Sequence, residues 1–330
     1  MTDIIFHIGL PKCMSSTLQR SVFVNEDGYL GTKPGPHLEE NFAKSLHECT
    51  PFGGRVTTNW KQVANWANRI RRLYPPTPKS ESRLLLSNEV LASSNRLSDR
   101  PIVDFLARFS GDVWQEGRVK AVLVLRNQPA RLASGYAQGS QSRFHPSQSD
   151  FERHIERFLQ RRGHLLDYAA WVEGLQSALG KENVGVFLLE ESRRISFWEE
   201  LQRFCRLEHL DIDKMVEGGG TQNKRARSRD TWAISPFDPQ FKAKVVVDKP
   251  LNVLWPKRFA QGARANVRGA AISAFAGVYA SRAKRLDPSQ RCTEISLTPE
   301  VVRLVQENVG ESNKRLASQL GKDIESLGYF

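Results

Sequence analysis

Residues 4–19, IIFHIGLPKCMSSTLQ, combine the features of a buried strand, a tight turn and a helix start. The run begins with isoleucine and phenylalanine, is punctuated by Gly9 and Pro11, and then enters a Ser/Ser/Thr cluster of the kind that opens helices. The free N–H groups of the helix start, its positive dipole end and Lys12 would converge just beyond the strand. The stretch therefore predicts an anion-binding corner or, more simply, a strand-to-helix turn whose hydroxyls only cap the helix.

The composition is that of a soluble globular protein with a basic surface. Of the 330 residues, 40% are hydrophobic and 25% are charged, which argues against a disordered chain. The formal net charge of +12 predicts a surface that attracts anions such as nucleotides, sulfated or phosphorylated sugars, nucleic acid or acidic membranes. The cysteines lie far apart, with no spacing for zinc, so we expect reduced thiols and no metal site: Cys13, Cys49, Cys205 and Cys292.

Hydrophobic segments long enough for membrane insertion are missing from the sequence. No window approaches the roughly 20 apolar residues that a spanning helix needs. The N-terminal apolar run is too short for a signal peptide and leads directly into the turn. We therefore expect a cytoplasmic protein without a membrane span.

Short apolar runs alternate with helical patterns along most of the chain. Strands are predicted at residues 4–8, 83–91, 119–125 and 184–189, and helices at 60–73, 102–109, 151–179, 197–205 and within 258–322. This alternation predicts an α/β fold, a single domain over residues 1–330 whose central, mostly parallel sheet is flanked by helices on both faces. A basic, proline-rich insertion is expected at about 218–256, with residues 232–256 extended.

Candidate bases lie in or next to the first two predicted strands. Ser87, Asn88 and Glu89 lie toward the carboxyl end of the strand predicted at residues 83–91, and open α/β sheets bind ligands outside the carboxyl ends of their strands. The Glu89 carboxylate could take a proton from an acceptor hydroxyl, or it could cap the next segment or pair with an arginine. His7 is a second candidate base, although its position within a strand better fits a buried, hydrogen-bonded structural residue.

A second strand-to-helix corner follows residues 119–125. Arg126 ends this strand, a helical pattern begins at once, and Ser134 comes eight residues later, about two turns into the helix. Arginine is well suited to grip a phosphate through two hydrogen bonds. The corner predicts a phosphate site, with a structural salt bridge of Arg126 as the alternative.

Residues 222–229, QNKRARSR, form the most basic stretch. They predict a loop over an anion or an exposed tail. No aromatic side chains are interleaved for base stacking, and no nucleic-acid module is recognisable elsewhere, which disfavours nucleic acid as a partner.

The two corners together resemble those of the sulfotransferase superfamily that uses 3′-phosphoadenosine 5′-phosphosulfate (PAPS). The 5′-phosphosulfate loop of that family is usually written H-I-G-x-P-K-T-G-T-T-x-L-Q, and residues 7–19 read HIGLPKCMSSTLQ. Its 3′-phosphate site is an arginine at a strand end followed eight positions later by serine, as in Arg126 and Ser134. The resemblance is closest to bacterial members and extends over nearly the whole chain.

The resemblance implies a P-loop nucleotide-kinase-like sulfotransferase fold. It also implies in-line transfer of a sulfuryl group from PAPS, as co-substrate and without a metal, to a hydroxyl of a carbohydrate or small metabolite. Lys12 would contact the bridging and transferred oxygens, and Glu89, with His7 second, would act as the base. The implied nucleotide-binding residues are Lys12, Cys13, Met14, Ser15, Ser16 and Thr17 at the 5′ side, Arg126 and Ser134 at the 3′ side, and Asn223, Lys224 and Arg225 closing over the nucleotide.

The sequence departs from the family loop at Cys13 and Met14, where the motif has threonine and glycine. Glycine permits positive φ and a close approach of the backbone to an anion, and methionine restricts both. A catalytically impaired nucleotide-binding homologue is therefore one alternative. A P-loop-like nucleotide or small-molecule kinase is another, although Walker A spacing is absent because no Ser or Thr follows Lys12.

Overall fold

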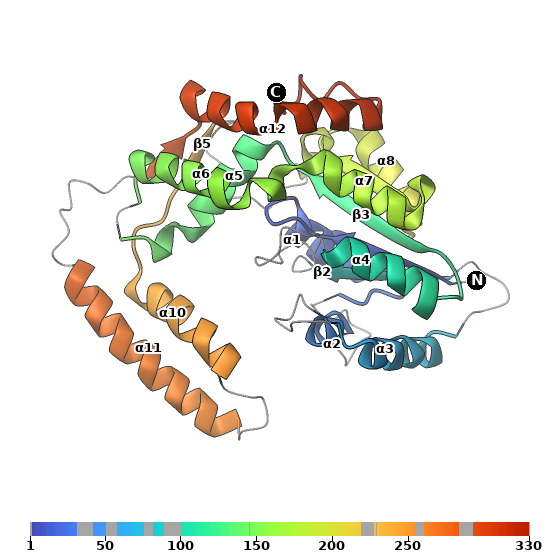
Figure 1. The fold of residues 1–330 in the computed structure, drawn as a ribbon, viewed down its shortest axis with the longest axis horizontal. Helices are drawn as coiled ribbons and strands as arrows, with labels where there is room; N and C mark the ends of the chain where they lie inside the picture. Colours follow the sequence, from blue (N-terminus) through green and yellow to red (C-terminus); the bar gives the residue numbers. More distant parts are fainter. Residues whose placement is uncertain are drawn as a thin grey trace. The chain divides into compact units, whose positions relative to one another are not determined.

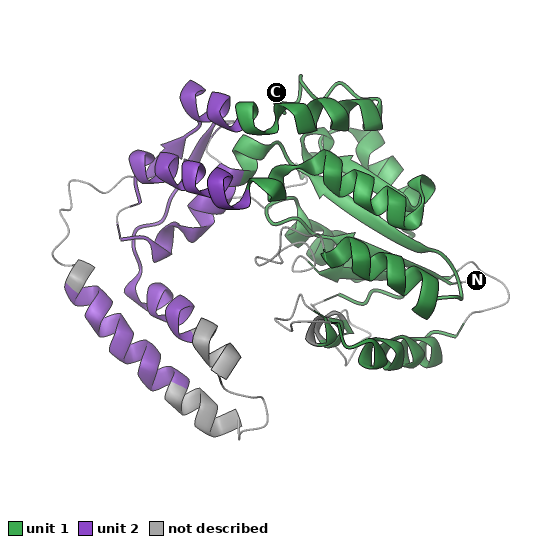
Figure 2. Ribbon diagram, viewed as in Figure 1, with its two compact units in different colours: residues 1–131, 163–222, 306–330 green, residues 132–162, 223–305 purple. Residues whose placement is uncertain are grey.

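The computed structural model describes residues 2–31, 42–50, 58–75, 82–88, 101–144, 146–218, 228, 230–254, 261–283 and 293–329. Its contacts divide the chain into two compact units, residues 1–131, 163–222 and 306–330, and residues 132–162 and 223–305 (Figure 2). A division by contacts does not show whether either unit folds alone, so the single domain over residues 1–330 stays a prediction.

The first unit is built on a parallel sheet whose strands are the four that the sequence predicts. They are β1 (Asp3–Ile8), β2 (Arg83–Asn88), β3 (Val119–Leu125) and β4 (Val184–Leu188), in the order β2-β1-β3-β4 (Figure 1). All residues of β1, β2 and β3 are buried, as expected for strands covered on both sides. Because β1 lies between β2 and β3, the loops that leave these strands share one edge of the sheet.

Helices cover both faces of this sheet, as predicted. The Phe6 ring packs against Phe109 with centroids 5.4 Å apart, and the Phe187 ring packs against Phe197 at 5.8 Å. Phe6 is in register, across β3, with Val184, which lies three residues before Phe187. Side chains alternate between faces along a strand, so the two phenylalanines point to opposite sides. The α/β fold class is thereby confirmed.

The helical elements of the first unit surround the sheet (Figure 1). They are α1 (Ser15–Thr17), η1 (Leu18–Val22), η2 (Phe23–Asn25), α2 (Phe42–Cys49), α3 (Trp60–Leu73), α4 (Pro101–Arg108), η4 (Phe109–Val113), η6 (Gly163–Leu166), α7 (Tyr168–Leu179), η7 (Lys181–Asn183), η8 (Leu189–Glu191), α8 (Ile195–Cys205) and α9 (Ile212–Glu217). The boundary between the units falls within α5 (Gln128–Gly139) and within α12 (Pro299–Leu320).

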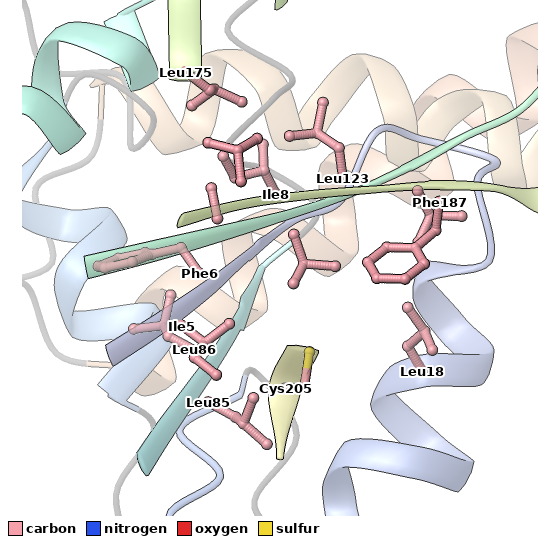
Figure 3. Close-up of a cluster of buried hydrophobic side chains, with 14 of the residues drawn as sticks. Ile5, Phe6, Ile8, Leu18, Leu85, Leu86, Leu123, Leu175, Phe187 and Cys205 are labelled. Carbon is pink, nitrogen blue, oxygen red and sulfur yellow. The ribbon is translucent and has the colours of Figure 1, made fainter. Parts of the chain in front are cut away.

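The core of the first unit lies against the sheet. Figure 3 shows side chains from each strand, among them Ile5, Leu86, Leu123 and Phe187, which are buried. Removing these apolar side chains from water is the main favourable contribution to folding. The packed core therefore holds the strands rigidly and fixes the positions of the loops at their ends.

The second unit holds a small antiparallel pair of strands and several helices. They are η5 (Ser140–Ser142), α6 (Gln148–Arg162), β5 (Thr231–Ala233), α10 (Pro239–Leu254), α11 (Gln261–Ala283) and β6 (Glu294–Ser296), with β5 paired to β6 and α10 packed along α11 (Figure 1). The C-terminal helices predicted within residues 258–322 are confirmed by α11 and α12.

The expectation that residues 232–256 are extended is wrong, because α10 occupies most of them. Pro239 is the first residue of this helix, where the missing N–H has no intrahelical acceptor to lose. The Asp238 carboxylate accepts hydrogen bonds from the N–H groups of Gln240 and Phe241 at 2.8 and 3.2 Å. Proline here starts a helix that an aspartate caps.

Among the described residues, none of the helices has the length and apolar character that a membrane-spanning segment requires.

Candidate functional site

The loop after β1 makes the tight turn that the sequence predicts. Lys12 and Met14 have φ angles of 72° and 63°, in the left-handed region. The Cys13 N–H donates to the Leu10 carbonyl at 3.2 Å, and the Thr17 N–H donates to the Met14 carbonyl at 2.9 Å, where helical structure starts. A left-handed conformation costs a residue other than glycine about 1–2 kcal/mol. Position 14 therefore has the backbone conformation that suits the glycine of the resembling motif.

The side chains of this loop divide into buried and accessible ones. Cys13, Met14, Ser15 and Thr17 are buried, and Met14 is part of the hydrophobic core. Burial raises the pKa of Cys13 to about 11, so its thiol stays protonated at neutral pH.

Two polar side chains of the same loop reach solvent. Ser16 is exposed and Lys12 is half-buried, whereas the Ser15 hydroxyl is directed at the Leu10 carbonyl, 3.5 Å away. Lys12 and Ser16 are thus the side chains of this loop that a ligand can reach.

The corner after β3 meets the loop after β1. Arg126 Nη1 donates to the Lys12 carbonyl oxygen at 3.5 Å, and the Arg126 carbonyl accepts a hydrogen bond from Tyr168 Oη at 2.9 Å. The structure therefore brings together the two residues on which the predicted 5′ and 3′ corners depend. Two cationic side chains share this edge of the sheet, which makes it attractive to an anion.

Asn127, next to Arg126, belongs to a partly buried hydrogen-bond network that sequence reasoning missed. Its backbone and side-chain N–H groups donate to Glu190 Oε1 at 2.9 and 3.0 Å, and Tyr329 Oη donates to Glu190 Oε2 at 3.1 Å. The pKa of Glu190 is raised because burial, which raises it, outweighs the hydrogen bonds from Asn127 and Tyr329, which lower it. The only signal for this network was the position of Glu190 at the end of a predicted strand.

Arg131 is a further cationic residue, in addition to Lys12 and Arg126, and no sequence pattern marked it. It is buried, and its Nη1 donates to the Leu165 carbonyl at 3.0 Å and to Tyr168 Oη at 3.2 Å. Among the described residues no carboxylate forms an ion pair with it. A buried guanidinium without a counter-charge adds positive potential behind Arg126.

His7 takes a buried place within β1. Its Nδ1 lies 2.7 Å from Ser87 Oγ, which also accepts a hydrogen bond from Gln19 Nε2 at 3.1 Å. Desolvation lowers the pKa of His7 to about 4, so the imidazole is neutral at pH 7. These contacts fit the structural role, and the catalytic role of His7 stays a prediction.

The remaining predicted site residues lie either outside the described residues or in the second unit. Glu89, Asn223, Lys224 and Arg225 lie outside the described residues. Ser134 is buried in α5 within the second unit, and its joint action with Arg126 stays a prediction.

Comparisons with known proteins find similarity to solved structures. No protein-family model matches this chain, and no curated protein matches it. The chain is similar to the crystal structure of a sulfotransferase from Alicyclobacillus acidocaldarius, with 15% identity and a TM-score of 0.41 over 98% of this chain and 97% of that one.

Proposed function

We propose that the chain is a cytoplasmic sulfotransferase that moves the sulfuryl group of PAPS to a hydroxyl of a carbohydrate or small-molecule acceptor. The observation that supports this most is the contact between Arg126 and the Lys12 loop. It joins, at one edge of the sheet, the two corners that resemble the 5′ and 3′ phosphate sites of the PAPS-dependent family.

The loop residues fit an oxyanion of this donor. Lys12 and Ser16 are accessible, and the turn already has the left-handed conformation that the motif glycine favours. The departure at Met14 does not cover the loop, since the methionine side chain is buried in the core. These features favour an active enzyme over an impaired homologue.

Sulfuryl transfer requires the protein to stabilise the charge on the leaving phosphate and to remove the proton of the acceptor hydroxyl. Lys12 would stabilise the charge that develops on the bridging oxygen, with helix N–H donors and the hydroxyl of Ser16 around the donor. Arg126 and Ser134 would hold the 3′-phosphate, and Asn223, Lys224 and Arg225 would close over the nucleotide. Glu89 would take the proton of the acceptor hydroxyl.

A thermal-shift comparison tests the donor. The bisphosphorylated product, 3′-phosphoadenosine 5′-phosphate, should raise the unfolding temperature without magnesium, because binding to the folded state stabilises it. A shift with ATP and magnesium but none with the bisphosphate would overturn the proposal in favour of a kinase.

A transfer assay separates an enzyme from a nucleotide-binding homologue. Wild type and Glu89→Gln are incubated with PAPS and a panel of hydroxyl acceptors, and sulfated product is measured. Wild type should transfer and Glu89→Gln should lose most turnover while binding the bisphosphate normally. Binding of the bisphosphate without transfer to any acceptor would favour the impaired homologue.

A further inference from the structure

The second unit contains a pocket of about 480 Å³ that the proposed function does not use. It is lined by Ser142, Arg143, Phe144, Asp150, Arg153 and Lys242. These residues come from η5 and the segment after it, from α6 and from α10. The volume falls within the range of about 300–1,000 Å³ typical of small-molecule sites.

The side chains that line this pocket are mainly cationic. Among the described residues that line it, Arg143, Arg153 and Lys242 supply three positive charges and Asp150 one negative charge, an excess of two positive charges. The carboxylate is already engaged, because its Oδ2 accepts hydrogen bonds from Arg143 Nη1 at 3.2 Å and from Tyr136 Oη at 2.9 Å. The pocket therefore has more cationic groups than its own acid can neutralise.

Arg153 and Lys242 keep their charged groups available. The Arg153 Nε donates to the Ser149 carbonyl at 3.3 Å, and Lys242 Nζ lies 5.9 Å from the centre of the Phe144 ring. Within the described part of the chain, neither residue forms an ion pair. Their cationic ends can be neutralised by a ligand at little cost in existing contacts.

Arg143 is held in place before any ligand arrives. Its guanidinium lies 4.4 Å from the centre of the Tyr136 ring, and Nη2 lies 3.0 Å from His154 Nδ1. Burial, followed by the charge of Arg143, lowers the pKa of His154 to about 4, so the imidazole is neutral and accepts the hydrogen bond. A preorganised arginine loses less conformational freedom when it binds an anion.

The backbone also fixes the two sides of the pocket relative to each other. The Asp238 N–H donates to the Gln141 carbonyl at 2.9 Å, which attaches the start of α10 to η5. The Phe144 ring stacks on Phe237 with centroids 4.5 Å apart, and Tyr279 of α11 packs against its edge at 5.8 Å. The pocket is thus built on packed helices, with an aromatic wall beside the charges.

We propose that this pocket binds the oxyanion of an acidic, sugar-sized molecule, the acid being a sulfate ester or a carboxylate. Arg153 and Lys242 form hydrogen bonds to the oxyanion, Arg143 adds fixed positive charge, and the ring of Phe144 faces the body of the ligand. This inference stands on the second unit alone and requires neither PAPS nor sulfuryl transfer.

Calorimetry with defined probes tests the proposal. Glucose 6-sulfate and glucuronate are titrated into wild type, with uncharged glucose as the reference. At least one of the acids should bind, and the one that binds identifies the acid group, whereas glucose should not. The double variant Arg153→Gln/Lys242→Gln should bind about 10-fold more weakly or worse, since each lost hydrogen bond joins charged groups.

Lys244→Gln is the matched control, because Lys244 lies on the same helix, is exposed and does not line the pocket. It should bind the acid as wild type does. If Lys244→Gln weakens binding as much as the double variant does, overall charge and not the pocket attracts the probe. The proposal would also be overturned if the double variant bound the acid as tightly as wild type, or if neither acid bound to wild type. If the double variant does not fold, Lys242→Gln alone carries the test.

A Lys12→Ala variant separates this inference from the proposed function. Glucose 6-sulfate or glucuronate should bind to it as tightly as to wild type, because Lys12 belongs to the first unit. Loss of binding there would place the acid on the β1 loop and reject the pocket while leaving the sulfotransferase proposal intact. Normal binding of 3′-phosphoadenosine 5′-phosphate to the double variant would show that the two sites are distinct.

Discussion

Arg126 Nη1 donates a hydrogen bond to the Lys12 carbonyl oxygen at 3.5 Å, although the two residues are 114 positions apart. They meet because β1 and β3 are neighbouring parallel strands and both loops leave the same edge of the sheet. The contact concentrates positive charge where open α/β sheets bind their ligands. Each corner alone is a common strand-to-helix turn, and their meeting is what supports a nucleotide with phosphates on two sides.

Replacing Arg126 with alanine should weaken the binding of 3′-phosphoadenosine 5′-phosphate by about 10- to 100-fold, because a hydrogen bond between charged groups is lost. Calorimetry on wild type and Arg126→Ala measures this. Arg72→Ala, at an exposed position of α3, removes the same charge and should leave affinity unchanged. Equal affinity in wild type and Arg126→Ala would remove the proposed 3′-phosphate site.

Position 14 should distinguish glycine from alanine. Met14→Gly and Met14→Ala both delete the buried part of the side chain beyond Cβ, but only glycine, which also lacks Cβ, removes the cost of the left-handed backbone at φ 63°. We expect both variants to be less stable than wild type and the glycine variant to be about 1 kcal/mol more stable than the alanine variant. Denaturant unfolding compares them, and an alanine variant of equal or higher stability would show that backbone strain at Met14 is negligible.

Stability should fall in acid partly through His7, whose pKa is lowered to about 4 by burial. Below the ordinary pKa of about 6.5, His7 binds a proton in the unfolded chain but stays neutral in the folded protein. Stability is therefore lost as pH falls from about 6.5 to 4. The full contribution is roughly 3 kcal/mol.

Urea unfolding at pH 7 and pH 4.5 should therefore show a smaller loss of stability in His7→Gln than in wild type. His154, whose pKa is also lowered to about 4, contributes to the pH dependence that remains, as do carboxyl groups such as Asp3 whose pKa is lowered. His209→Gln, at an exposed position, is the control and should behave as wild type does. An unchanged slope in His7→Gln would mean that the imidazole is not kept neutral.

Tyr329→Phe should destabilise the protein by about 1.5–3 kcal/mol, because it deletes the hydroxyl that donates to the partly buried Glu190 carboxylate at 3.1 Å. Tyr29→Phe provides the matched comparison, since the Tyr29 hydroxyl is buried and has no hydrogen-bond partner among the described residues. It should be neutral or slightly stabilising. Equal effects of the two changes in thermal unfolding would show that the Glu190 contact contributes nothing.

The sequence by itself determined the strands, most helices and the two corners. Apolar runs such as residues 119–125 and helical spacing such as that of residues 60–73 are local signals. They predict these elements correctly because the apolar side chains that form each pattern are the ones that the folded protein buries. Local turn chemistry likewise placed the bend after β1 correctly. Local turn chemistry gives the wrong prediction at residues 232–256, where the prolines predict extended chain although Pro239 begins a helix.

Only the tertiary structure decided which of these pieces meet. Strand order brings Arg126 to Lys12. The packing of the C-terminal segment brings Tyr329 to Glu190, and the packing of helices α6 and α10 places Arg153 and Lys242 in one pocket. Such contacts depend on packing between segments far apart in the chain, which no local pattern encodes. The residue types capable of binding an anion were readable from the sequence, whereas their grouping into sites followed from the packing of the sheet and helices.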